Sequence, residues 1–265
     1  MTYALLLQLF KDAAIPSPAT DARLLLSHFF GVSPAEILAH PERDYTGDGF
    51  AAAVAQRMSR VPLQHILGEA YFYGNRFLVS PDCLIPRADT ELLVEEACRL
   101  LPKGAHFADF CTGSGCIALS VLSQRTDTTA LGVDISPKAL AVAQKNADAL
   151  GLSTRVAWHT CDLLQTNLPH DAPRYILSNP PYIRDSVIST LEPELSHEPR
   201  IALCGGEDGL LFYRTLLSRF SPDLFLFEIG FDQGDAVAAL GREKGYTATV
   251  KKDLGGCDRL VILSR

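Results

Sequence analysis

The chain has 265 residues, 24 lysines and arginines against 31 aspartates and glutamates, and a net charge of -7. Its 47% apolar and 21% charged residues are typical of a soluble globular protein and exclude a disordered chain. No stretch approaches the ~20 apolar residues of a membrane helix, and the start has no basic signal-peptide region. The negative charge disfavours tight, sequence-independent binding to nucleic acid. We expect a cytoplasmic, monomeric protein.

Seven cysteines and seven histidines are present, but they form no familiar metal or disulfide pattern. The cysteine number is odd and no pair is spaced C-x-x-C, which predicts reduced thiols. No H-E-x-x-H or H-x-x-x-H cluster occurs, so we expect no metal site.

The first quarter of the chain has helical periodicity. Apolar residues at helical spacing and Ser-Pro or Gly boundaries predict helices over residues 2–14, 18–30, 34–39 and 48–60. Residues 1–65 contain five basic and six acidic side chains, which does not suit a basic nucleic-acid arm. This segment, 1–65, is expected to be a small helical domain that recognises a substrate, with a purely structural cap as the alternative.

A β-rich stretch follows. Residues 70–73 and 76–79 alternate around Gly74-Asn75, which predicts a hairpin in a linker spanning residues 66–86. Acidic residues then crowd the first turns of a predicted helix from about Asp89 to Leu101.

From His106 onward, strands and helices alternate, as in an α/β protein with a largely parallel sheet. The chain ends strand–turn–strand, which favours a seven-stranded, Rossmann-like class I methyltransferase sheet over a dinucleotide dehydrogenase; this domain is expected over residues 87–265. Strands are predicted at 106–110, 129–133, 155–160, 175–178, 224–229, 246–251 and 259–263, and helices at 115–124, 136–150, 209–220 and 232–244.

Three acidic or glycine-rich segments follow predicted strands. The loop Asp109-Phe-Cys-Thr-Gly-Ser-Gly115 suits a backbone that approaches a ligand, although it also satisfies a loose nicotinamide pattern with Asp134 placed 21 positions after Gly113. Asp134 can accept hydrogen bonds from both hydroxyls of a ribose, and a role as an acid at the start of the next helix, beside Ser136, is the alternative. Asp162 can accept from an adenine amino group, with a plain turn aspartate as the alternative, and Leu163 can pack on the base or its rim.

The decisive motif is Ser178-Asn-Pro-Pro-Tyr-Ile183, at the end of the fourth strand. Its prolines stiffen the backbone, while backbone carbonyls and the Asn179 side-chain oxygen can accept hydrogen bonds at one point. Tyr182 adds an aromatic wall. Such a site suits a planar NH2 group whose lone pair must be turned towards an electrophilic methyl, by positioning rather than by a strong base.

With these motifs, the chain resembles the HemK-like release-factor glutamine methyltransferases. The resemblance begins near residue 62. Further segments that carry it are Gln64-His-Ile-Leu-Gly68, Ile85-Pro-Arg-Ala-Asp-Thr-Glu91, His197-Glu-Pro199, Ala202-Leu-Cys-Gly-Gly-Glu-Asp-Gly-Leu210, Glu228-Ile-Gly230 and Asp253-Leu-Gly-Gly-Cys-Asp-Arg259.

The resemblance implies S-adenosylmethionine as cofactor, S-adenosylhomocysteine as product and peptide chain release factors as protein substrates. The amide nitrogen (N5) of the glutamine in their Gly-Gly-Gln motif would be methylated. It implies cofactor-binding residues Cys111, Thr112, Gly113, Ser114, Gly115, Asp134, Asp162, Leu163 and Asn179, catalytic residues Asn179, Pro180 and Tyr182, and substrate-binding residues Asn179, Pro180, Pro181 and Tyr182.

Two positions depart from the family pattern. Cys111 replaces a usual glycine, which predicts a loop that does not rely on a positive φ there, and Ala88 replaces a common proline. Two alternatives stay open. One is a nucleic-acid amino-group methyltransferase acting on adenine N6 or guanine N2, and the other is a nicotinamide-dependent dehydrogenase or dinucleotide sensor.

Overall fold

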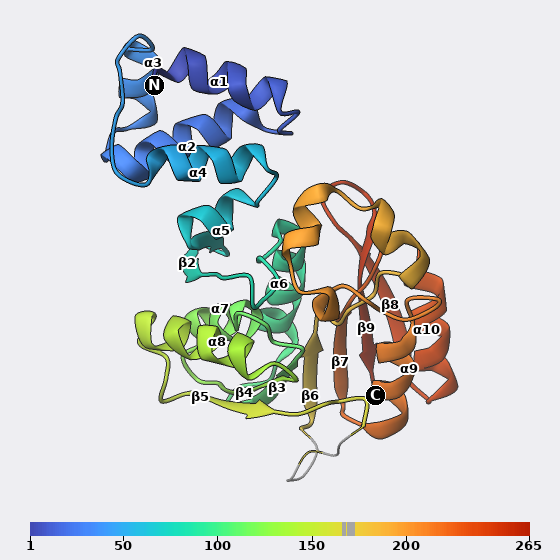
Figure 1. The fold of residues 1–265 in the computed structure, drawn as a ribbon. Coiled ribbons are helices and arrows are strands. Elements are labelled where there is room, and N and C mark those ends of the chain that lie inside the picture. The colour runs from blue at the N-terminus through green and yellow to red at the C-terminus, as the bar shows by residue number, and fades with distance from the viewer. Residues whose placement is uncertain (166–167, 169–172) are drawn as a thin grey trace. The chain divides into compact units, whose positions relative to one another are not determined.

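The computed structural model describes residues 1–165, 168 and 173–265. These form two compact units (Figure 1). The first contains Met1–Glu69 and Glu192–His197, and the second contains Ala70–Leu191 and Glu198–Arg265. Within the described residues, no helix has the length and apolar character needed to cross a membrane. No disulfide joins the seven cysteines, all of which are described.

The first unit is a helical bundle around a core that includes Leu6, Phe10 and Leu25. The hydroxyls of Thr2 and Ser33 cap the first and third helices, as their sequence positions favour. All four predicted helices are confirmed, and a fifth, short one follows Pro62, where five residues are too few to show a period. The helices are α1 (Tyr3–Asp12), α2 (Pro18–Phe30), α3 (Pro34–Ala39), α4 (Phe50–Met58) and α5 (Leu63–Leu67).

A buried ion-pair network anchors the Glu192–His197 segment in this unit. The Arg57 side chain, 5% exposed, donates to Asp21 at 2.7 Å and to Glu194 at 3.1 Å. Arg60 donates two hydrogen bonds to the same Glu194 carboxylate, from Nε at 2.7 Å and from Nη2 at 2.6 Å. Burial raises the pKa of Glu194, but the hydrogen bonds from Arg60 and Arg57 outweigh it, so the pKa lies below its usual value.

The predicted hairpin is present, with its turn one residue earlier than expected. Strands β1 (Glu69–Phe72) and β2 (Asn75–Leu78) are joined by Tyr73 and Gly74, whose φ angles are +48° and +75°. Two positive φ angles are typical of a type I′ turn, whose twist matches that of the strands. Asn75 therefore belongs to the second strand, and its side chain donates to the Tyr73 carbonyl at 3.3 Å.

The seven-stranded sheet of the second unit confirms the predicted α/β fold. Its order is β5-β4-β3-β6-β7-β9-β8, parallel except for β9, which runs antiparallel to both neighbours. The strands are β3 (His106–Phe110), β4 (Thr129–Asp134), β5 (Val156–Thr160), β6 (Tyr175–Ser178), β7 (Leu224–Glu228), β8 (Thr247–Lys252) and β9 (Asp258–Ser264).

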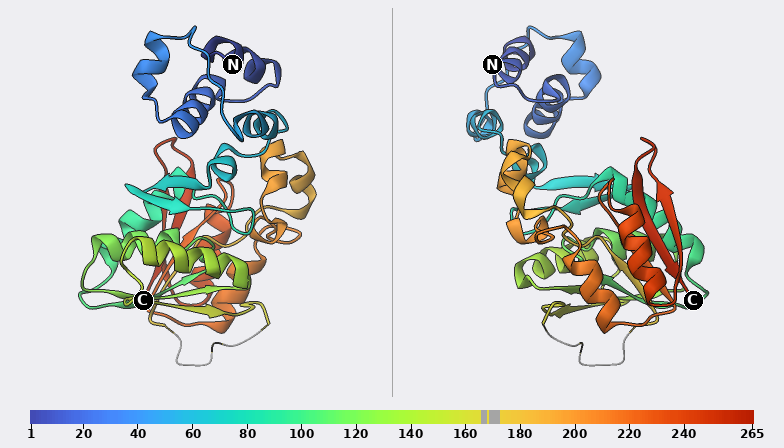
Figure 2. Two further views of the ribbon diagram at one scale, coloured as in Figure 1. Left: turned by 60° about the vertical axis from the view of Figure 1, so that its left-hand side comes forward. Right: turned by 90° about the vertical axis from the view of Figure 1, so that its right-hand side faces the viewer.

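Alternating side chains divide the sheet into two apolar faces. In β7, Leu224 and Leu226 belong to one core, whereas Phe225 and Phe227 belong to the other. Both faces are covered, as a largely parallel sheet requires. Figure 2 shows the helices on either side of the strands. One face carries α6 (Glu91–Leu100), α7 (Cys116–Gln124) and α8 (Pro137–Ala149), and the other carries α9 (Leu211–Arg219) and α10 (Gly234–Glu243).

The strand order reverses between β3 and β6, so the loops after these strands diverge and leave a crevice. Four short 3₁₀ helices among the described residues were not predicted, because each is too short for a periodic pattern. They are η1 (Ala88–Thr90), η2 (Asp185–Thr190), η3 (Pro193–His197) and η4 (Arg200–Ala202).

Candidate functional site

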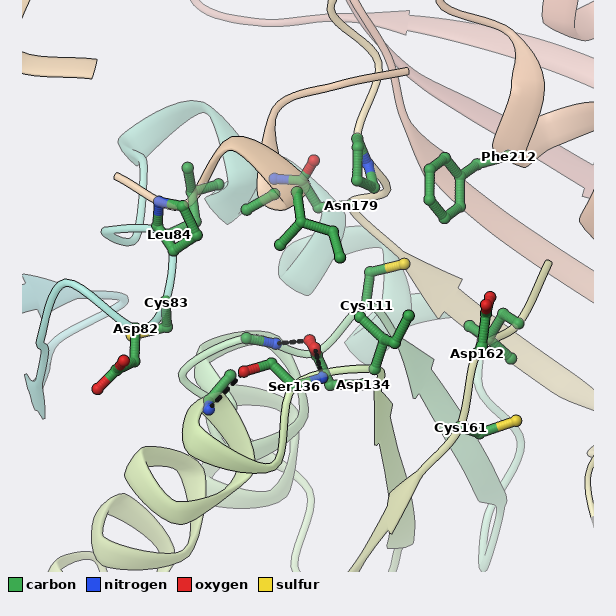
Figure 3. A pocket seen from close by; sticks show the side chains of 18 of the residues that line it. Asp82, Cys83, Leu84, Cys111, Asp134, Ser136, Cys161, Asp162, Asn179 and Phe212 are labelled. Carbon is green, nitrogen blue, oxygen red and sulfur yellow. Dashed lines mark hydrogen bonds between the residues drawn. The ribbon is translucent and has the colours of Figure 1, made fainter. Parts of the chain in front are cut away.

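A pocket lies at the carboxyl ends of β3, β4, β5 and β6, entirely within the second unit (Figure 3). It holds about 800 Å³, counting the part open to solvent, which is within the range of pockets for small molecules and cofactors. Among the residues proposed from the sequence, those that line it are Cys111, Gly113, Asp134, Asp162, Leu163, Asn179 and Pro181. Those that do not are Thr112, Ser114, Gly115, Pro180 and Tyr182.

Asp109 holds the loop after β3 in shape. Its buried Oδ2 accepts hydrogen bonds from the Thr112 hydroxyl at 2.6 Å and from the Ala118 N–H at 3.2 Å. The second bond satisfies a free donor at the start of α7. Burial raises the pKa of the Asp109 carboxyl to about 7, although both hydrogen bonds oppose the increase.

The two glycines of this loop have different roles. Gly115 has φ +79°, and a Cβ there would lie 2.9 Å from the Trp158 ring and 3.1 Å from the Ala143 Cβ. Packing therefore requires a glycine at position 115. Gly113 has φ +55° and lines the pocket, and a Cβ there would meet nothing within 4 Å. The space beside Gly113 thus belongs to the pocket, which suits a bound ligand.

The structure corrects the prediction made for Cys111. Its φ is +59°, so the loop does use a left-handed residue at this position, despite the missing glycine. A side chain in this region costs roughly 1–2 kcal/mol, which the surrounding loop must offset. Burial raises the pKa of the Cys111 thiol, so the side chain lines the pocket as a neutral group.

Asp134 joins two loops of the pocket. Its Oδ2 accepts from the Gly113 N–H and its Oδ1 from the Ser136 N–H, both at 2.9 Å (Figure 3). Burial raises its pKa, while these backbone bonds act in the opposite direction. Because each carboxylate oxygen has a further lone pair, Asp134 can still accept two hydrogen bonds from a ligand.

Asp162 and Leu163 form another part of the wall, after β5. The Asp162 Oδ1 accepts from the Leu164 N–H at 2.9 Å, which fixes the carboxylate in a local turn. Leu163 is buried and presents an apolar surface to the pocket. A polar acceptor beside an apolar side chain suits a flat heterocycle with an amino group.

The motif after β6 is held by hydrogen bonds to residues that do not line the pocket. The Asn179 Nδ2 donates to the Thr90 hydroxyl at 3.3 Å, which leaves the side-chain oxygen to accept from another group. The Tyr182 hydroxyl donates to Glu228 at 3.4 Å, and the Tyr182 carbonyl accepts from Gln233 at 3.0 Å. The role of Tyr182 as an aromatic wall stays a prediction, since its ring does not line the pocket.

Most of the remaining residues that line the pocket were not predicted from the sequence. Glu198, which is buried, accepts from the Ile85 N–H at 2.9 Å and pairs with Arg87. This contact explains why the two segments that contain them, far apart in the sequence, line one pocket. Both segments were singled out from the sequence only for the family resemblance, and no role at the site was predicted for them. The lining residues missed are Asp82, Cys83, Leu84, Ile135, Ser136, Ala139, Cys161, Leu164, Pro199, Ile201, Ala202 and Phe212.

Within the ranges 1–165 and 173–265 and at residue 168, no three or more His, Cys, Asp or Glu side chains are grouped to hold a metal ion.

Comparison with known proteins identifies the family. Residues 4–68 match the PrmC N-terminal domain, and residues 88–198 match the methyltransferase small domain. The release factor glutamine methyltransferase of Caulobacter vibrioides is 42% identical over 264 residues, covering 95% of this chain and 91% of that protein. The chain belongs to the release factor glutamine methyltransferase family. The Cereibacter sphaeroides member is 40% identical, with 94% and 92% covered.

A solved structure supports the fold of this family member. The hMettl16 catalytic domain, crystallised in complex with a 3'UTR hairpin, aligns with a TM-score of 0.55 over 82% of each chain. At 14% sequence identity, this likeness shows a shared fold alone.

The buried Asp109 predicts a pH-dependent stability. Its folded-state pKa of about 7 exceeds the ordinary value of 3.8, so folding takes up a proton. The contribution to stability is complete below the ordinary value and is lost as the pH rises to about 7. Relative to wild type, the free energy of unfolding of Asp109→Asn should therefore rise by about 3 kcal/mol from about pH 5 to about pH 8. Urea unfolding followed by Trp158 fluorescence measures this, and a pH-independent difference would contradict it.

Proposed function

We propose that this chain transfers a methyl group from S-adenosylmethionine to a release-factor glutamine. The acceptor is the side-chain amide nitrogen (N5) in the Gly-Gly-Gln motif, which exchanges one hydrogen for the methyl group, so S-adenosylhomocysteine and a proton are released. The observation that carries the proposal is that one pocket combines Asp134, Asp162 and the Asn179 side chain, in a member of this family. The negative net charge of -7 gives no support to a nucleic-acid acceptor.

The residues present fit the cofactor. Asp134 would accept from the ribose hydroxyls, Asp162 from the adenine amino group, and Leu163 would pack on the base. The space beside Gly113 and the neighbouring residues 111–115 would receive the rest of the molecule. The bound cofactor supplies an electrophilic methyl group on a positively charged sulfur.

The chain's own contribution to the reaction is positioning. An amide nitrogen is a poor nucleophile because its lone pair is delocalised into the carbonyl group. The Asn179 side-chain oxygen and the Pro180 carbonyl would accept hydrogen bonds from the two N–H groups of the substrate amide. These contacts would turn the lone pair of the nitrogen towards the methyl group. Pro181 would close the pocket wall and Tyr182 would bound the glutamine.

The two units suggest a division of labour. We assign residues 1–65 to recognition of a second surface of the release factor, residues 66–86 to a linker and residues 87–265 to methyl transfer. The first unit also contains Glu192–His197, so we assign the η3 segment to the helical unit as well.

The direct test of this function is mass spectrometry of an intact release factor after incubation with the protein and S-adenosylmethionine. One methyl group should appear on the glutamine of the Gly-Gly-Gln motif. A factor in which that glutamine is replaced should stay unmodified. Methylation of RNA or DNA amino groups instead would refute the proposal.

Asp134→Ala should weaken S-adenosylmethionine binding by about 1.5–3 kcal/mol, because hydrogen bonds to a charged group are lost. Calorimetry measures the affinity. Asp148→Ala, an exposed change on the helix that Asp134 precedes, serves as the control and should bind normally. Unchanged affinity in Asp134→Ala would exclude the ribose role.

Asn179→Ala should impair methyl transfer far more than cofactor binding. Its oxygen acts chiefly in the transition state, so kcat should fall by ~10²–10³, the scale of a lost oxyanion-hole donor. Tyr182→Phe should be milder than Tyr182→Ala, because the ring rather than the hydroxyl bounds the substrate. Steady-state kinetics with an intact factor decide the matter, and normal turnover at saturation with weakened cofactor binding would contradict it.

Recognition by the helical unit can be tested without deleting residues 1–65. Such a deletion would also remove Arg57 and Arg60, the arginine partners of Glu194. Leu5 and Leu38 are apolar yet 52% and 54% exposed. Leu5→Asp combined with Leu38→Asp should raise KM for the intact factor severalfold. The same variant should treat a short Gly-Gly-Gln peptide like wild type, because the peptide has no second surface. An unchanged KM for the intact factor would contradict recognition through these two side chains.

A further inference from the structure

A buried carboxyl group lies behind the Asn179–Tyr182 motif. Glu228, the last residue of β7, is 2% exposed, and its Oε2 has no hydrogen-bond partner among the described residues. Burial raises its pKa to about 7. Such a group is costly for stability, and Glu228 does not line the pocket, so neither packing nor ligand contact accounts for it.

Two polar groups of the motif are concerned, the Tyr182 hydroxyl and the Asn179 side-chain amide, and Glu228 contacts the hydroxyl directly. The Tyr182 hydroxyl donates to its Oε1 at 3.4 Å. The Tyr182 backbone is held separately, since its carbonyl accepts from Gln233 and a Cβ on Gly209 would lie 2.4 Å from that carbonyl oxygen. With the backbone fixed, the contact to Glu228 sets the direction of the ring.

The second polar group is reached through Thr90, which is 2% exposed. Its hydroxyl accepts from the Asn179 Nδ2 at 3.3 Å, so its single hydrogen must be donated elsewhere. We assign Glu228 as the acceptor of this hydrogen, because burial raises the pKa of the Glu228 carboxyl and hydrogen bonding from Thr90 lowers it again in part. The carboxyl therefore orients the hydroxyl, and the hydroxyl orients the amide.

Arg259 completes the surroundings of this carboxyl. Its guanidinium pairs with Asp253 at 3.1 Å and with Asp89 at 3.2 Å. The positive charge also acts on Glu228 and favours its ionised, hydrogen-bond-accepting form.

We propose that Thr90 and Glu228 are positioning residues that hold Asn179 and Tyr182 in their reactive orientations. A side-chain amide can rotate to exchange its oxygen and nitrogen. If the Asn179 Nδ2 faced the pocket, it would present a donor to the donor N–H groups of the substrate amide. Thr90, oriented by Glu228, prevents this exchange by accepting from Nδ2. The inference rests on the proposed methylation of a glutamine amide.

The test is a double-mutant cycle on the full-length protein. Thr90→Val removes the hydroxyl with little change in shape and should lower kcat about tenfold, with the S-adenosylmethionine Kd within about twofold of wild type. In an Asn179→Ala background, the same change should lower kcat no further, because the group through which it acts is gone. Thr90→Ser, which keeps the hydroxyl, should recover most of the lost activity.

Thr128→Val is the matched control. Thr128 is 1% exposed and its hydroxyl donates to the Arg125 carbonyl at 3.0 Å, away from the pocket. This variant should lose stability but keep its kcat. Glu228→Gln, a second variant, should lower kcat without changing cofactor affinity.

Normal kcat in Thr90→Val, or an equal loss in the wild-type and Asn179→Ala backgrounds, would overturn the inference. Absence of glutamine methylation by the wild-type protein would refute the proposed function instead, so the two failures are distinguishable.

Discussion

The pocket depends on one carboxylate that joins two loops. Asp134 accepts from Gly113 in the loop after β3 and from Ser136 at the start of α8, each at 2.9 Å. Because β3 and β4 are neighbouring parallel strands, both loops emerge at the same edge of the sheet. The residue proposed to bind the ribose therefore also shapes the pocket, and ligand affinity and loop geometry are linked through a single side chain.

The sequence predicted the parts of the site that follow buried strands. Gly113, Asp134, Asp162 and Asn179 each lie at or shortly after the end of a recognisable apolar run, and parallel strands bring their carboxyl ends together. The antiparallel final pair was predictable as well, since no helix separates β8 from β9.

Other features depend on contacts that local patterns do not encode. The positive φ of Cys111 requires a loop held by Asp109 and Asp134, whereas residue type alone favours a negative φ. The pocket-lining segment that contains η4 is positioned by Glu198, which accepts a hydrogen bond from Ile85, 113 residues away in the sequence. Likewise, Glu228 is buried because it ends β7, which lies inside the sheet between β6 and β9.

The central claim is that the strand-end pocket brings a cofactor and a glutamine amide to Asn179. The most direct measurement is a crystal structure of the protein with S-adenosylhomocysteine and a Gly-Gly-Gln peptide. The account predicts ribose hydroxyls on the Asp134 carboxylate and the glutamine amide nitrogen within hydrogen-bond distance of the Asn179 side-chain oxygen. A nucleoside bound elsewhere, or a glutamine that does not reach Asn179, would contradict it.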